Sequence, residues 1–116
     1  MNIIAFKALL ETKTTDDVYI DFVPEGKTIP ALSFTHITDG WLRILNGHKS
    51  GVWDSWRVLI VGNSRAECDA ILTSLDELDN TKSNDFSKVF IMAKGNLISS
   101  PSDKTRTAFL DIKTYG

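Results

Sequence analysis

The sequence predicts a single α+β domain over residues 1–116, with an N-terminal helix and one longer helix packed on a sheet of about five strands. Strand-like alternation occurs in consecutive segments instead of alternating with helices, which predicts a mostly antiparallel or mixed sheet. Only two segments space their apolar residues as a helix does. A chain of 116 residues can also bury a core without disulfides. The expected order of elements is therefore α-β-β-β-α-β-β.

Composition and charge are those of an ordinary soluble domain. Apolar residues make up 42% of the chain and charged residues 24%, with a net charge of −2. Residues 1–58 hold six Lys and Arg against seven Asp and Glu, and the remainder holds seven against eight. The charges are evenly distributed along the chain, without the basic stripe that is typical of a nucleic-acid-binding protein. Cys68 is the only cysteine, so no intramolecular disulfide can form and no cysteine-based metal site is expected.

The first two elements follow from hydrophobic periodicity. Residues 2–13 are expected to form an amphipathic helix, with an apolar side made of Ile3, Phe6 (or Ala5), Leu9 and Leu10. Residues 17–23 alternate apolar and polar side chains and are expected to form a strand. The chain start lacks the basic leader of a signal peptide, and no run approaches the roughly 20 apolar residues that span a bilayer. We therefore expect synthesis in the cytoplasm and no membrane partner.

The middle of the chain combines turn signals with apolar residues. Residues 24–30 are expected to form a loop between two prolines, and residues 31–37 a second strand. Residues 38–51 are expected to form a long loop, because they contain three glycines and an Asn-Gly pair. This segment is also rich in apolar side chains, and a large exposed apolar surface on a soluble protein marks an interaction site.

Residues 52–61 are expected to form a central strand that is covered on both sides. The following helix begins after Ser64, which forms a capping box with Glu67. Its apolar stripe is made of Cys68, Ile71, Leu72, Leu75 and Leu78. A phosphate-binding turn would need several glycines, or a Lys followed by Ser or Thr. Gly62 alone indicates a structural turn. Residues 87–93 and 106–115 are the last two expected strands, joined by a polar connection.

Residues suited to catalysis or metal binding are few. His36 and His48 are the only histidines, and neither has a carboxylate or cysteine at ligand spacing along the chain. We interpret His36 as a strand residue that makes one hydrogen bond. Asp16 and Asp17 form a carboxylate pair, but adjacent acids at a turn are more often solvated than catalytic. We therefore expect no catalytic residue, no metal ion and no cofactor.

Over nearly its full length, the chain resembles the tail terminator (tail completion) family of long-tailed phages, whose best-known member is minor tail protein U. The resemblance rests on the succession of segments and not on a signature motif. A helix leads into "DVYIDFVPEGKTIPALSFTHI", a long loop follows, and "SWRVLIVGNSRAECDAILTSLDELD" supplies a strand and a helix. The segments "SKVFIMA" and "RTAFLDIKTYG" complete the pattern.

The resemblance implies a structural virion protein of the tail, with no enzymatic activity. Family members form a hexameric ring on the end of the tail tube, stop its polymerisation and present a surface to the head. The implied partners are further copies of the chain, the tail tube protein and a head–tail connector protein, with DNA only as passing cargo. Because interfaces favour apolar residues, Trp and Arg, we predict contacts with the neighbouring subunit through Trp41, Leu42, Arg43, Ile44, Leu45 and Trp53.

Two alternatives stay open on the sequence alone. The chain is also similar in size and composition to other neck or connector components of phages, which would likewise assemble into rings. A different class is a small ligand-binding or enzymatic α+β domain, whose site would form between segments distant in sequence. That class would need a ligand pocket, whereas the first two need a surface for assembly.

Overall fold

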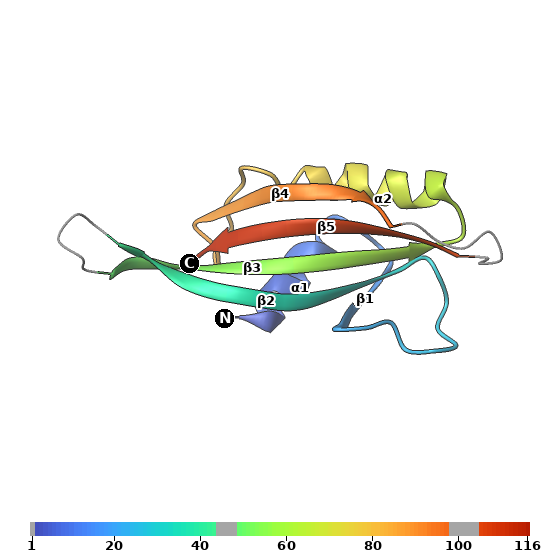
Figure 1. The fold of residues 1–116 in the computed structure, drawn as a ribbon, viewed down its shortest axis with the longest axis horizontal. Helices are drawn as coiled ribbons and strands as arrows, with labels where there is room; N and C mark the ends of the chain where they lie inside the picture. The colour runs from blue at the N-terminus through green and yellow to red at the C-terminus, as the bar shows by residue number, and fades with distance from the viewer. Residues whose placement is uncertain (1, 44–48, 98–104) are drawn as a thin grey trace.

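The computed structural model describes residues 2–43, 49–97 and 105–116. The elements follow the predicted order and confirm an α+β fold (Figure 1). They are α1 (Ile3–Glu11), β1 (Asp17–Ile20), β2 (Ala31–Arg43), β3 (Lys49–Gly62), α2 (Arg65–Asp76), β4 (Lys88–Asn96) and β5 (Arg106–Tyr115).

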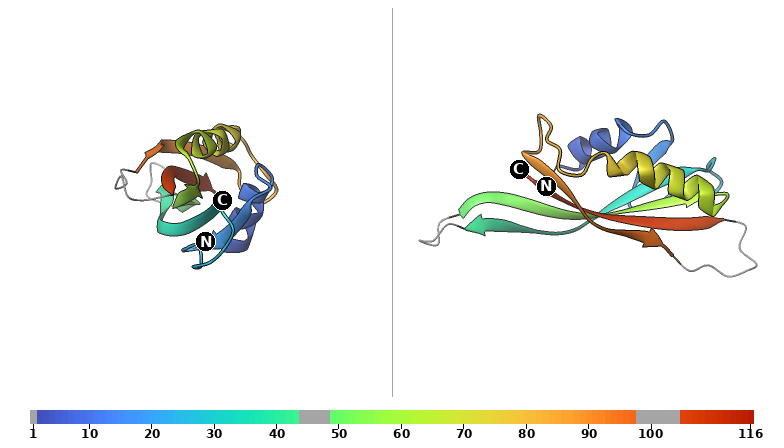
Figure 2. Two further views of the ribbon diagram at one scale, coloured as in Figure 1. Left: turned by 90° about the vertical axis from the view of Figure 1, so that its right-hand side faces the viewer. Right: turned by 90° about the horizontal axis from the view of Figure 1, so that it is seen from above.

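The five strands form one mixed sheet in the order β1-β2-β3-β5-β4. β1 pairs with β2 in parallel, and the remaining three pairings are antiparallel. Both helices lie on one face of the sheet, and in the described part of the chain no helix covers the other face (Figure 2). The expectation that the central strand is covered on both sides is therefore wrong. Leu59 and Val61, on the second face of β3, are only half-buried.

The core lies between the helices and the covered face. The alternation of β3 and β5 places every second side chain in it, including Trp56 and Ile112, which are fully buried. Phe6 of α1 stacks on Trp56 with ring centroids 4.2 Å apart and planes inclined by 4°. Trp56 Nε1 donates a hydrogen bond of 2.9 Å to Thr114 Oγ1, which satisfies the one polar atom of the buried indole.

Both helices begin at side-chain caps. The Asn2 carboxamide oxygen accepts a hydrogen bond from the amide of Ala5 at the start of α1. At α2, Ser64 Oγ accepts from the amide of Glu67, as the predicted capping box requires. The return bond differs from the standard box, because the Glu67 carboxylate accepts from the amide of Asn63 and not from that of Ser64.

The largest difference from the predicted elements concerns residues 38–51. β2 continues to Arg43 and β3 begins at Lys49, so the described residues of this segment are paired strands and not a loop. Cross-strand pairing engages the described backbone of both segments, and Gly40 and Gly51 are tolerated within it. The Asn46-Gly47 pair, on which the turn prediction depended, lies outside the described residues.

Two other strand ends also differ. β1 ends at Ile20, three residues before the predicted end of the strand. The reason is that Asp21 adopts a φ of 69°, in the left-handed region that breaks a strand. β4 runs on to Asn96, which pairs with Ala108 of β5. Neither described helix is long and apolar enough to cross a membrane.

Candidate functional site

A two-stranded arm projects from one end of the sheet. We define the arm by residues 41–43 of β2 and 49–52 of β3, whose strand pairing in the described structure is with each other. At its base, the Val52 carbonyl also accepts a hydrogen bond of 2.9 Å from the amide of Gly116, just after β5. The third strand of this region, β5, first joins at Trp53, which pairs with Tyr115. The arm extends the molecule along its longest dimension, 55 Å against 25 and 23 Å for the others (Figure 1).

The residues predicted to contact a neighbouring subunit lie at this end. The backbones of Trp41, Leu42 and Arg43 belong to the arm, but their side chains lie outside the described part of the structure. Ile44 and Leu45 lie outside it altogether. Trp53 is half-buried at the base of the arm. Of the six predicted contact residues, the structure places the backbones of three in the arm and Trp53 at its base. Their role in assembly stays a prediction.

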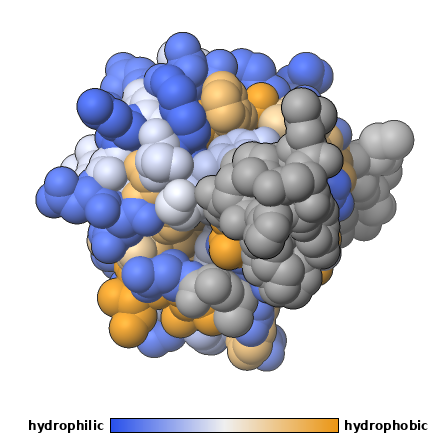
Figure 3. Space-filling model, turned by 90° about the vertical axis from the view of Figure 1, so that its left-hand side faces the viewer, coloured by the Kyte–Doolittle hydropathy of each residue, from blue (hydrophilic) through white to orange (hydrophobic). Residues whose placement is uncertain are grey.

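The surface at this end is mixed in character. Viewed along the long axis, hydrophilic residues are interspersed with apolar patches (Figure 3). Exposed apolar side chains in the described residues include Ile37 on β2 and Val52 on the arm, with 57% and 38% of their surface accessible. Apolar groups beside polar ones are compatible with a protein interface, but the rest of a protein surface has a similar composition.

The face of the sheet without helices, which we call the open face, carries aromatic and charged side chains from β3 and β5. They are Trp53, Arg57, Phe109, Asp111, Lys113 and Tyr115. Arg57 donates two hydrogen bonds to Asp111, from Nε at 2.8 Å and from Nη2 at 3.0 Å. This bidentate pair raises the pKa of the exposed Arg57, through the hydrogen bonds first and the carboxylate charge second.

Cations on the open face also lie over its rings. The guanidinium carbon of Arg57 is 5.0 Å from the centroid of the Phe109 ring. Lys113 Nζ is 4.2 Å from the Trp53 ring and 5.5 Å from the Tyr115 ring. These contacts hold the side chains in place before any partner arrives, so binding would cost less side-chain entropy.

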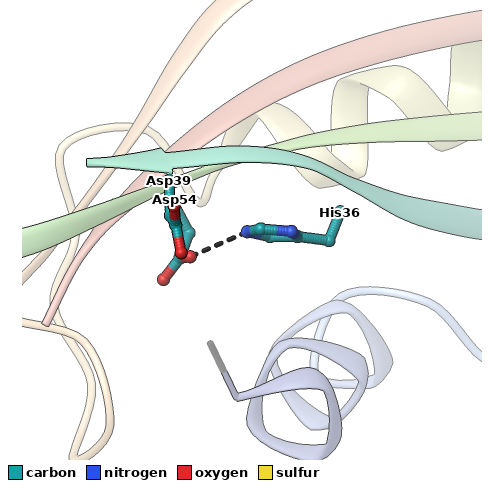
Figure 4. A group of neighbouring side chains, drawn as sticks. All are labelled: His36, Asp39 and Asp54. Carbon is teal, nitrogen blue, oxygen red and sulfur yellow. Dashed lines mark hydrogen bonds and ion pairs between the residues drawn. The ribbon is translucent and has the colours of Figure 1, made fainter.

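A second cluster lies on the helix-covered side, where β2 and β3 approach the arm. His36 Nε2 and Asp54 Oδ1 are 2.8 Å apart, and the Asp39 carboxylate completes the group (Figure 4). One ligand atom from each residue lies within 4.8 Å of the others. Asp54 is buried, with 7% of its surface accessible, His36 is half-buried and Asp39 is exposed. The His36 ring also meets the edge of Trp56 at 4.9 Å.

The sequence interpretation of His36 was right about its hydrogen bond and wrong about its surroundings. A carboxylate three positions away points to the opposite side of a regular strand, but the register of β2 shifts between His36 and Thr38. The extra residue brings Asp39 to the side of His36. No local signal in the sequence marks this shift, so the cluster was missed.

The other candidates do not converge into a site. Asp16 accepts a hydrogen bond from Thr14, whereas Asp17 begins β1 and faces the hydroxyl of Tyr19 at 3.5 Å. An open hollow of about 430 Å³ lies beside Asp16, between the end of α1 and α2, and its lining is mostly polar. Cys68 is buried, and His48 lies outside the described residues.

Comparisons with known proteins bear on the fold. No protein-family model matches the sequence, and no curated protein sequence matches it. A solved structure that is similar is a chain from the virion of a native gene transfer agent (GTA) particle. The two chains are 13% identical, with a TM-score of 0.56, and the match covers 97% of this chain and 85% of that one. At this identity the match shows that the two chains share a fold.

Proposed function

We propose that the protein is a structural component of a phage-like virion and acts as a tail terminator. In this role it forms a hexameric ring at the head-proximal end of the tail tube, ends tube polymerisation and joins the tail to the head. The observation that carries the proposal is the shared fold with a chain of a gene transfer agent virion, which extends over 97% of this chain. The resemblance in the order of segments supports the specific position in the tail.

The arm supports a role in assembly on physical grounds. An isolated two-stranded ribbon is marginally stable in water, because neither face has a sheet or helix to pack on. The strand pairing of the described arm residues is with each other, and a hydrogen bond from Gly116 to Val52 at the base links them to the end of the chain. Contact with a neighbouring subunit would supply the missing packing. The predicted contact residues at this end are Trp41, Leu42, Arg43, Ile44, Leu45 and Trp53.

The open face supports assembly in a second way. Its half-buried aromatic residues and Arg57 are of the types enriched at protein interfaces. No helix of the described chain covers this face. The partners in this role would be further copies of the chain, the tail tube protein and a head–tail connector. Because the net charge is −2 and basic residues are not in excess, DNA would pass as cargo without sequence-specific binding.

The first test is the assembly state of the purified protein. Native mass spectrometry over a range of concentrations, followed by negative-stain imaging, should detect hexamers that appear as rings. If the protein stays monomeric, purified tail tubes should be added, because a tube end can template the ring. A protein that neither forms rings nor binds tube ends would contradict the proposal. A ring that caps connectors but not tubes would indicate another neck component instead.

A further inference from the structure

We propose that His36, Asp39 and Asp54 bind one divalent cation of the first transition series, with Zn²⁺ as the representative ion. The ligand atoms would be Nε2 of the imidazole and one oxygen of each carboxylate. These three atoms already lie within 4.8 Å of one another (Figure 4). The site would join β2 to β3 below the arm. The proposal does not depend on the proposed function.

The backbone places the three side chains on one side of the sheet. The step from His36 to Asp39 covers three residues of β2. The matching step on β3, from Trp56 to Asp54, covers only two. The extra residue on β2 reverses the alternation beyond it, so Asp39 faces the same side as His36. Since strand pairing fixes this arrangement, the three side chains face the same side of the sheet before an ion arrives.

The negative charges in the cluster favour the binding of a cation. Asp39 and Asp54 are directly opposite each other on antiparallel strands, where two like charges destabilise the pairing. Asp54 is buried, and among the described residues its one side-chain partner is His36. Neither carboxylate forms an ion pair with a Lys or Arg in the described residues. One ion bound between the carboxylates would neutralise both and replace the repulsion by attraction.

The kinds of ligand select the kind of ion. Imidazole nitrogen suits zinc and its neighbours, whereas magnesium and calcium prefer sites made only of oxygen. At metal–ligand distances of about 2.0–2.2 Å, neighbouring ligand atoms lie about 3.0–3.5 Å apart. His36 Nε2 and Asp54 Oδ1, at 2.8 Å, are close to that spacing. Asp39 is exposed and can rotate inward, and water would fill the remaining positions.

The test measures binding of ZnCl₂ to the full chain after dialysis against EDTA. Isothermal titration should show one Zn²⁺ per chain, and the thermal midpoint should rise by about 4 °C or more in excess Zn²⁺. MgCl₂ at the same concentration should give no such rise. Failure to bind Zn²⁺ at millimolar concentration would overturn the proposal.

Matched variants locate the site. Asp39→Asn removes one ligand at an exposed position, so the chain should fold, and its Zn²⁺ affinity should fall at least about tenfold. Asp85→Asn, an exposed change in the turn before β4, should leave the affinity unchanged. The chain has only one other histidine, His48. His48→Gln should retain binding and His36→Gln should lose it. Zn²⁺ binding that survives His36→Gln and Asp39→Asn would place the ion elsewhere and overturn the assignment.

Discussion

The indole ring of Trp53 lies over Gly40, its partner on the neighbouring strand β2. A Cβ atom added at Gly40 would lie 2.5 Å from Cζ2 of that ring, which is closer than any real contact allows. Glycine normally weakens a strand, because it brings no side chain to the sheet. Here the absence of a side chain makes room for the ring of Trp53, which protects the backbone of β2 at the base of the arm.

This contact predicts the effect of Gly40→Ala. The new methyl group must displace the indole ring, and we expect a loss of about 1–3 kcal/mol in the free energy of unfolding. Urea denaturation with tryptophan fluorescence measures that loss. In a Trp53→Ala background the obstacle is gone, so the same glycine substitution should cost little. If Gly40→Ala lowered the free energy of unfolding equally in both backgrounds, the Trp53 ring would not be the obstacle to the new methyl group.

A second prediction concerns the polar atom at the centre of the core. Thr114→Val removes the hydroxyl that accepts the 2.9 Å hydrogen bond from Trp56 Nε1 and keeps the volume of the side chain. The buried indole N–H is left without a partner, which should cost about 1–3 kcal/mol. Thr107→Val, at a half-buried position of the same strand, is the control and should cost much less. Similar costs for the two variants would contradict the assigned role of the hydrogen bond.

A third prediction follows from Cys68. Burial, together with the negative charges of Glu67 and Asp69, raises the pKa of the Cys68 thiol. The folded state therefore holds the proton more tightly than the unfolded state. The resulting contribution to stability is fully present below the unfolded thiol pKa of about 8.5. It declines as the pH rises through that value towards the higher folded pKa, by at most about 1.4 kcal/mol per pH unit.

The comparison with Cys68→Ala isolates this effect. The alanine variant should be less stable than the wild type at pH 7, because it leaves a cavity in the core. The difference in the free energy of unfolding between the two proteins should become smaller between pH 8 and 10, since only the wild type carries the thiol. Chemical denaturation at several pH values measures it. A difference that stays constant over this range would show that the thiol does not titrate differently in the two states.

The elements that could be predicted from the sequence are those fixed by neighbouring residues. The apolar side of α1 was predicted correctly from spacing alone, and Phe6, Leu9 and Leu10 are buried. The start of α2 was predicted from Ser64 and Glu67, because a helix cap is formed within a few residues. In both cases the signal and the structure that it specifies lie in the same short segment.

The features that could not be predicted depend on pairing between distant segments. The strands that replace the expected loop at 38–51 are stabilised by each other, so neither segment reveals them alone. The register shift near Ile37 is likewise defined only against β3. Because a shift of one residue moves a side chain to the other face, the sequence hides the grouping of His36, Asp39 and Asp54. The open face is also a property of the assembled sheet and cannot be read from a single strand.

The final prediction tests the arm as a contact with the neighbouring subunit. Trp41→Ala should impair ring formation, while the thermal midpoint of the monomer should change by no more than about 4 °C. The physical reason is that the backbone of Trp41 lies in the arm, where β5 no longer pairs with β3. Native mass spectrometry measures the assembly, and calorimetry measures the monomer. Ile4→Ala is the control, because Ile4 is an apolar residue of α1 with 81% of its surface exposed, and it should leave both unchanged. A large loss of monomer stability in Trp41→Ala would instead place this side chain in the core and refute the proposed contact.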